Sequence, residues 1–161
     1  MSNHSRPLRF GIICTNTTFP AWEADCIRNL IALNTVTPEL LIMDTRESGR
    51  LATLRKTGFN KILGLVHRRV VALPKAMRPV DLSTELGGLK RIKCMVRVAG
   101  NCSEFFCDDD IGQIREFGLD FILRFGFNII RGDILDVPKY GVWSFHHGDE
   151  TKYRGSPPAF W

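Results

Sequence analysis

The sequence has no apolar run that approaches the roughly 20 residues of a membrane-spanning helix. Its first residues, Met1 to Pro7, are polar and lack the apolar stretch of a secretion signal. With 44% hydrophobic and 24% charged residues, the composition is that of an ordinary globular protein. We therefore expect a cytoplasmic protein that forms one domain, 1–161, and does not act at a membrane.

Paired cysteine motifs are also missing. The five cysteines are odd in number and no CxxC occurs; they are Cys14, Cys26, Cys94, Cys102 and Cys107. Cys102 and Cys107 are separated by four residues, without two further ligands nearby, which is not a usual zinc spacing. We expect reduced thiols, with Cys14 and Cys26 as small core residues, and no metal site.

Aromatic residues do not interleave with the most basic part of the chain. Residues 46–97 hold 13 Lys and Arg against 3 Asp and Glu, whereas residues 98–161 hold 6 against 10. A basic stretch can meet nucleic acid, a nucleotide-sugar or a polyglutamylated cofactor. Without aromatic stacking platforms we favour a solvated surface excursion at about 46–91, and nucleic-acid binding is not expected.

The first half of the chain reads as strand, helix, strand. The apolar run Leu8 to Cys14 predicts a buried strand, and Pro20 opens a helix whose apolar residues recur at helical spacing as far as Leu33. Residues 34–38 predict a break, and Glu39 to Met43 predict a second strand. This order is the start of a parallel α/β unit.

The second half continues the alternation. Strands are predicted at 92–98, 121–125 and 142–145, and helices at 108–118 and 130–135. Three aspartates open the first of these helices and suit its N-terminus as caps. The predicted fold is therefore α/β, a Rossmann-like, mostly parallel sheet flanked by helices and incomplete on its C-terminal side.

The glycine-rich fingerprint of dinucleotide-binding folds is absent from the first loop, which reads Thr15-Asn16-Thr17-Thr18-Phe19-Pro20. A dinucleotide cofactor is therefore not expected. Ligands of open parallel sheets bind outside the carboxyl ends of the strands. Two such ends, Gly126-Phe127 and His146-His147, are the predicted walls of one pocket.

Proton-handling groups concentrate in the loop 141–155. It holds two adjacent His, two carboxylates, a Lys and an Arg between two Gly, as catalytic loops at the ends of buried strands often do. This donor set also resembles that of a divalent metal site. Because His146 and His147 would point to opposite faces of an extended chain, we favour an acid/base role over a metal site.

Residues 119–161 resemble the N-terminal catalytic domain of the folate-dependent formyltransferases, such as methionyl-tRNA formyltransferase and glycinamide ribonucleotide formyltransferase. That family pairs a strand ending in a Gly-aromatic turn with a later strand reading G-x-x-N-x-H-P-S-L-L-P-x-Y-R-G-x-x-P. This chain has Leu119 to Phe127 for the first, and Gly141 to His146 with Tyr153 to Pro158 for the second. The strings L-R-F-G-F and W-S-F-H-H-G-D also resemble a formyltransferase-like subgroup of uncertain substrate.

The resemblance implies roles for residues of the last strand and its loop. His146 falls on the family's catalytic His, and Ser144 on the Asn that steadies the formyl oxygen. The serine is a departure, since a hydroxyl reaches less far than an amide. The stretch P-S-L-L-P of the family is replaced by His147 to Thr151, a second departure, so the roles there follow from residue chemistry alone. Asp149 would be an auxiliary catalytic carboxylate and Glu150 an anchor for the substrate amine, in either order, or both would belong to a solvated acidic turn. His147 would bind the substrate, and Arg154 would hold an anionic substrate group or fix the loop.

The resemblance also implies a cofactor site. Five residues fall where family members line the pocket for 10-formyltetrahydrofolate, largely by backbone contacts: Gly126, Phe127, Asn128, Ile129 and Ile130. Their apolar side chains fit a core position equally well. The family's third catalytic residue, an Asp, falls beyond Trp161, so we expect either a fragment or a naturally short domain.

These observations lead to one main hypothesis and two alternatives. The main one is a one-carbon transferase that moves a formyl group from 10-formyltetrahydrofolate to an amine of a small molecule or sugar nucleotide. The first alternative is a non-catalytic or truncated binding module that uses the same pocket, and the second is a hydrolase that passes the formyl group to water. An uncovered apolar surface near Phe160 and Trp161 predicts poor solubility or a homodimer.

Overall fold

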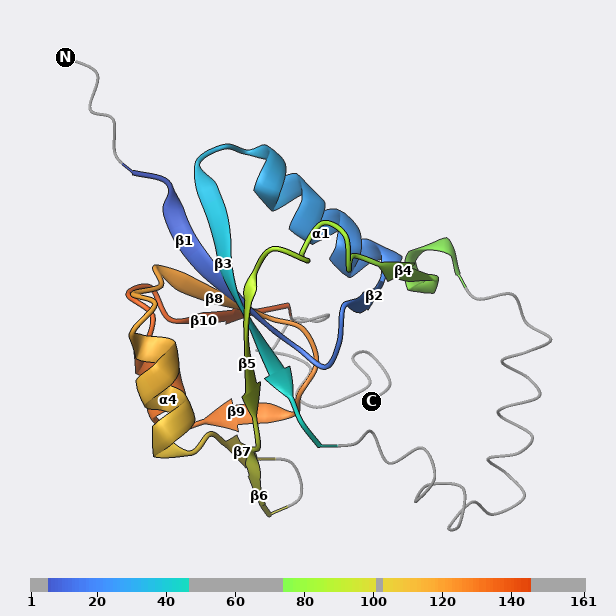
Figure 1. The fold of residues 1–161 in the computed structure, drawn as a ribbon. Coiled ribbons are helices and arrows are strands. Elements are labelled where there is room, and N and C mark those ends of the chain that lie inside the picture. The colour runs from blue at the N-terminus through green and yellow to red at the C-terminus, as the bar shows by residue number, and fades with distance from the viewer. Residues whose placement is uncertain (1–5, 47–73, 101–102, 146–161) are drawn as a thin grey trace, which may run out of the picture.

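The computed structural model describes residues 6–46, 74–100 and 103–145. Five parallel strands form a central sheet with the order β10-β8-β1-β3-β5 (Figure 1). The strands are β1 (Leu8–Cys14), β3 (Val36–Asp44), β5 (Lys90–Cys94), β8 (Phe121–Arg124) and β10 (Val142–Ser144). Counted along the chain this order is 5-4-1-2-3, which is the Rossmann order 3-2-1-4-5-6 without its sixth strand, so the predicted α/β class is confirmed.

Helices cover both faces of the sheet. Helix α1 (Ala21–Ala32) lies on one face and helix α4 (Asp108–Arg115) on the other (Figure 1). In β1 the side chain of Ile12 packs in the cluster on the α1 face, and that of Ile13 packs in the cluster on the α4 face. A strand buried on both sides reads as a continuous apolar run, which is why the sequence predicts β1 well.

Two smaller sheets and two 3-10 turns complete the described structure. Strand β2 (Thr18–Pro20) pairs antiparallel with β4 (Pro79–Asp81). A three-stranded sheet has the order β6-β7-β9, with β6 (Arg97–Ala99), β7 (Ser103–Phe105) and β9 (Ile129–Arg131). The 3-10 turns are η1 (Lys75–Met77) and η2 (Asp133–Asp136). No helix in the described ranges is long and apolar enough to cross a bilayer.

Three predicted segments are wrong. The break at 34–38 is shorter than expected, because β3 already starts at Val36 and runs through Pro38, which precedes an extra, unpaired residue at Glu39. The single strand predicted at 92–98 is two strands of different sheets, β5 and β6. The helix predicted at 130–135 is β9 followed by η2, since Gly132 with φ 83° ends the strand sharply.

Helix α4 begins as the sequence predicts, with one difference. The three aspartates occupy its first turn, where they suit the helix dipole, but the N-cap residue is Cys107 and no side chain caps the helix by a hydrogen bond. Cys14 and Cys26 are free thiols in or against the core, as expected. Burial raises the pKa of Cys14 to about 12, so this thiol stays protonated and unreactive at neutral pH.

The basic side chains in residues 74–97 all lie at the surface. Three of them, Lys90, Arg91 and Lys93, belong to β5, which is an edge strand of the central sheet. Charges on an edge strand discourage pairing with another chain. The described part of the basic stretch is thus a solvated surface; the rest of it, residues 47–73, lies outside the described residues.

A buried carboxylate joins the amino ends of β1 and β8. The Asp120 side chain is 3% exposed and accepts hydrogen bonds from the backbone N–H of Arg9 at 2.8 Å and from both terminal nitrogens of Arg6, at 2.7 and 3.0 Å. The Arg6 guanidinium, followed by the Arg9 backbone bond, lowers the pKa of Asp120 below its usual range. The charged form is therefore the one that stabilises the fold.

Replacing Asp120 by Asn should destabilise the protein in a pH-dependent way. A carboxyl group with a lowered folded-state pKa contributes stability above its unfolded pKa of about 3.9, and this contribution is lost as the pH falls through the folded pKa. We expect a loss of about 1–3 kcal/mol at pH 7 that shrinks as the pH falls below 4. Urea denaturation at several pH values measures it. The exposed Asp136→Asn is the control, and a pH-independent difference would contradict the account.

Candidate functional site

The candidate site lies at the carboxyl edge of the central sheet. Strands β3 and β8 flank β1 on opposite sides, so the direction in which successive strands are added to the sheet reverses at β1. Open α/β sheets bind ligands at the carboxyl ends of the strands beside such a reversal. The loop after β1 and the turn after β8 touch at this point. A Cβ placed on Gly126 would lie 3.3 Å from Oγ1 of Thr15, so only a residue without a side chain fits comfortably.

The turn after β8 has an uncommon backbone. Gly126 has φ 82° and Phe127 has φ 58°, two successive residues in the left-handed region. This conformation is ordinary for glycine and strained for phenylalanine, so the surroundings must hold it. The Phe127 ring is stacked near that of Phe106, with centroids 5.8 Å apart, and the guanidinium of Arg46 lies 5.7 Å from its centre.

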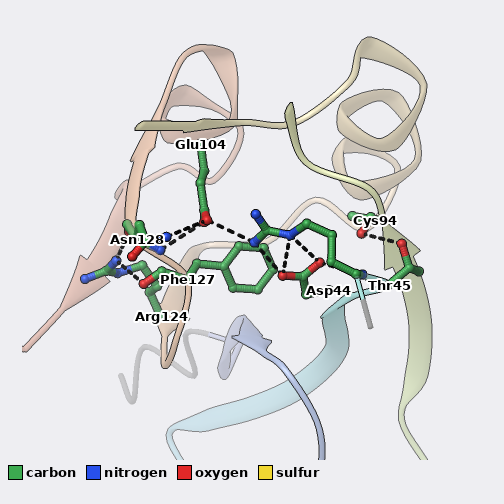
Figure 2. A network of polar contacts seen from close by, with 8 residues as sticks. Asp44, Thr45, Cys94, Glu104, Arg124, Phe127 and Asn128 are labelled. Atoms are coloured by element: carbon green, nitrogen blue, oxygen red, sulfur yellow. Dashed lines mark hydrogen bonds and ion pairs between the residues drawn. The ribbon is translucent and has the colours of Figure 1, made fainter. Parts of the chain in front are cut away.

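Arg124, the last residue of β8, fixes the turn from within. Its guanidinium donates to the backbone carbonyls of Phe127, at 3.4 Å, and of Asn128 (Figure 2). The side chain is half-buried, and this burial lowers the pKa of Arg124, while nearby Glu104 raises it. The cation therefore stabilises the turn and at the same time places a positive charge beside the edge.

Glu104 on β7 holds the same turn from the other side. Its side chain is fully buried and accepts hydrogen bonds from the backbone N–H and the side-chain amide of Asn128, each at 2.9 Å. It also pairs with Arg46 at 2.9 Å. A buried carboxylate is stable only when it is paired and hydrogen-bonded, and here three donors meet that need.

Arg46 connects this carboxylate to the end of β3. Its Nε lies 2.9 and 2.8 Å from the two carboxylate oxygens of Asp44, and one terminal nitrogen lies 2.5 Å from the second of them. Its pKa is raised, first by Asp44 and further by Glu104. Asp44, Arg46, Glu104 and Asn128 thus form one chain of contacts, which we call the edge network. Figure 2 labels three of them, Asp44, Glu104 and Asn128.

Ser144 is the residue that the sequence proposes as a hydrogen-bond donor. It ends β10, is exposed, and is in register with Arg124 on β8, so the two residues share one face of the sheet. The next residue, Phe145, faces the other way and packs on Trp22 and Phe125, with ring centroids 5.2 and 5.9 Å away. The edge therefore presents a hydroxyl next to a guanidinium.

The residues predicted to line a cofactor site divide into two groups. Gly126, Phe127 and Asn128 form the turn at the edge, and Ile129 is 49% exposed at the start of β9. Ile130 is only 8% exposed, and its side chain belongs to the core cluster on the α4 face, which is the alternative that the sequence leaves open for these apolar side chains.

Most residues predicted for catalysis and substrate binding lie outside the described residues. They are His146, His147, Asp149, Glu150 and Arg154. Phe160 and Trp161, on which the expected homodimer depends, lie outside them as well. All of these assignments stay predictions.

The sequence reasoning missed the edge network. Asp44 was recognisable only as a polar residue at the end of a strand. Arg46, Glu104 and Arg124 come from three separate segments, with no spacing that links them. Only the pairing of β7 with β9, which brings Glu104 opposite Ile130 and close to Asn128, puts them together.

The described part of the edge can position a ligand better than it can move a proton. The carboxylates of Asp44 and Glu104 are engaged by cations, and the Cys14 thiol has a pKa of about 12. Arg124 and Ser144 offer hydrogen-bond donors. Among the described residues, this set therefore offers hydrogen-bond donors and no unpaired carboxylate.

No protein-family model, curated protein or solved structure matches this chain. The formyltransferase resemblance therefore depends on the residues quoted above, and it stays a hypothesis.

Removing the Glu104 carboxylate should destabilise the protein strongly. Glu104→Ala leaves Arg46 and the Asn128 amide without their buried acceptor, so we expect a loss of about 2–4 kcal/mol in the free energy of unfolding. Glu39→Ala is the matched control, because Glu39 forms a partly exposed pair with Arg9 at 3.4 Å and should cost less than about 1 kcal/mol. Equal losses in urea denaturation would show that the edge network is not a main support of the fold.

Proposed function

We propose that the carboxyl edge binds 10-formyltetrahydrofolate and that the domain transfers its formyl group to an amine of a small molecule or sugar nucleotide. The observation that carries the proposal is the left-handed turn Gly126-Phe127. It is held in place by Arg124 and Glu104, and at Gly126 the missing side chain lets the turn lie close to Thr15 of the loop after β1. Such a preformed surface suits a planar heterocycle.

The chemistry follows from the groups expected at the edge. The acceptor amine attacks the formyl carbon, and negative charge develops on the formyl oxygen. Ser144 would donate a hydrogen bond to that oxygen, and the Arg124 cation beside it would favour the charge. His146, two residues after Ser144, would take the proton from the attacking amine and return one to the departing folate nitrogen.

A non-catalytic binding module is the second candidate. The observation that favours it is that Asp44, Glu104 and Arg124 are already used in internal contacts, which leaves Ser144 as a weaker donor than the asparagine of the resembling family. Binding of a folate without formyl transfer would distinguish this candidate from the enzyme.

Folate binding should depend on the Gly126-Phe127 turn. Calorimetric titration with a stable 10-formyltetrahydrofolate analogue should show binding by the wild type that Phe127→Asp removes. Phe117→Asp is the control, because Phe117 packs half-buried against the same core cluster but lies at the end of α4. If both variants bind like the wild type, or if folded wild type does not bind, the folate site is not at this turn.

Formyl transfer should depend on Ser144 and His146. Ser144→Ala should lower the turnover number on the order of 10²–10³-fold, and Ser144→Asn should retain or raise it, because an amide restores the donor. His146→Ala should abolish turnover without changing the circular dichroism spectrum. The readout is release of tetrahydrofolate in the presence of an amino-sugar nucleotide. Wild-type turnover that survives both alanine substitutions would contradict the assigned roles.

A further inference from the structure

A second candidate binding site lies away from the carboxyl edge. A cavity of about 490 Å³ opens between the three-stranded sheet and the start of α4. Its lining includes Arg97, Phe105, Phe106, Asp108, Arg131 and Asp133, and none of the edge-network residues. Phe105 lies on the face of β7 opposite to the neighbouring Glu104. Phe106 lines the cavity and also stacks on Phe127, so its ring lies between the cavity and the turn after β8.

Two cations and an aromatic ring form a row across the small sheet. Arg97 on β6 is in register with Phe105 on β7, and Phe105 is in register with Arg131 on β9. Residues in register share a face, so the ring lies between the two arginines. The row is a property of the strand pairing and does not depend on a single side-chain rotamer.

Both guanidinium groups are held in place. That of Arg97 lies over the Phe105 ring, 4.8 Å from its centre, and the Nε of Arg131 donates to Oγ of Ser103 at 3.0 Å. A guanidinium held in this way loses less conformational entropy when it binds a carboxylate. Neither arginine takes part in any of the ion pairs between described residues.

Two carboxylates and two apolar side chains also line this cavity. Asp108, in the first turn of α4, and Asp133, in η2, line it and are likewise absent from the ion pairs between described residues. The side chains of Phe106 and Ile111 add apolar surface, and both are mostly buried. Charges of both signs therefore line one hollow, and none of them forms an ion pair with another described residue.

A ligand that matches this cavity would have a carboxylate, an ammonium group and an apolar part between them. The volume corresponds to roughly 16 water molecules at about 30 Å³ each, which exceeds a single ion and suits a molecule the size of a dipeptide. We propose that this cavity binds short apolar peptides with free termini. The arginines would hold the carboxylate, and Asp108 and Asp133 the ammonium group.

Three related peptides test this proposal. Calorimetric titration uses the dipeptide leucyl-phenylalanine, its N-acetyl derivative, which lacks the cation, and its C-terminal amide, which lacks the anion. We expect each derivative to bind at least about tenfold more weakly than the free dipeptide, since each loses a charge-assisted hydrogen bond. Absence of binding at millimolar concentration, or equal binding of all three, would overturn the proposal.

Two double variants test which residues bind the carboxylate and the ammonium group of the peptide. In Arg97→Gln/Arg131→Gln the preference for the free carboxylate should disappear, and in Asp108→Asn/Asp133→Asn the preference for the free ammonium should disappear. Arg115→Gln and Asp109→Asn are controls, because both residues are exposed on α4 and do not line the cavity. A melting temperature close to that of the wild type shows that each variant is folded. Unchanged preferences in folded double variants would place the peptide elsewhere and so contradict the proposal.

Discussion

A carboxylate with no exposed surface connects three parts of the chain that are distant in sequence. Glu104 accepts from Arg46, which is anchored to the end of β3, and from the backbone and side chain of Asn128, which follows the turn after β8. An unpaired charge at this position would be strongly destabilising, so the three segments must come together or the carboxylate stays in water. The shape of the carboxyl edge depends on this pairing.

The edge network also explains how a strained turn persists next to the centre of the sheet. Phe127 adopts a left-handed backbone that a phenylalanine on its own would avoid, and contacts from Arg124, Arg46 and Phe106 surround it. Strain of this kind is common where a fold presents backbone to a ligand. The edge network therefore lies at the position at which open parallel sheets bind ligands.

The sequence predicts what is local and periodic. The apolar runs of β1 and β8 and the helical spacing of α1 give these elements directly, and the order of strands and helices gives the parallel sheet. It does not predict that Pro38 lies within a strand, or that residues 92–98 divide between two sheets, because pairing partners decide both. The edge network could not be predicted either, because strand pairing brings its residues together. Of the site residues proposed from the sequence, Gly126, Phe127, Asn128 and Ser144 lie together at the edge, whereas Ile130 belongs to the core.

The central claim is that the turn after β8 is the ligand-binding surface of this protein. Its most direct test is to follow the backbone amide resonances by NMR during titration with a stable 10-formyltetrahydrofolate analogue. The account predicts that shift changes concentrate at Gly126, Phe127 and Asn128 and at their neighbours Thr15 and Ser144. Shift changes confined to other regions, such as the cavity beside α4, or no changes in a folded sample, would contradict it.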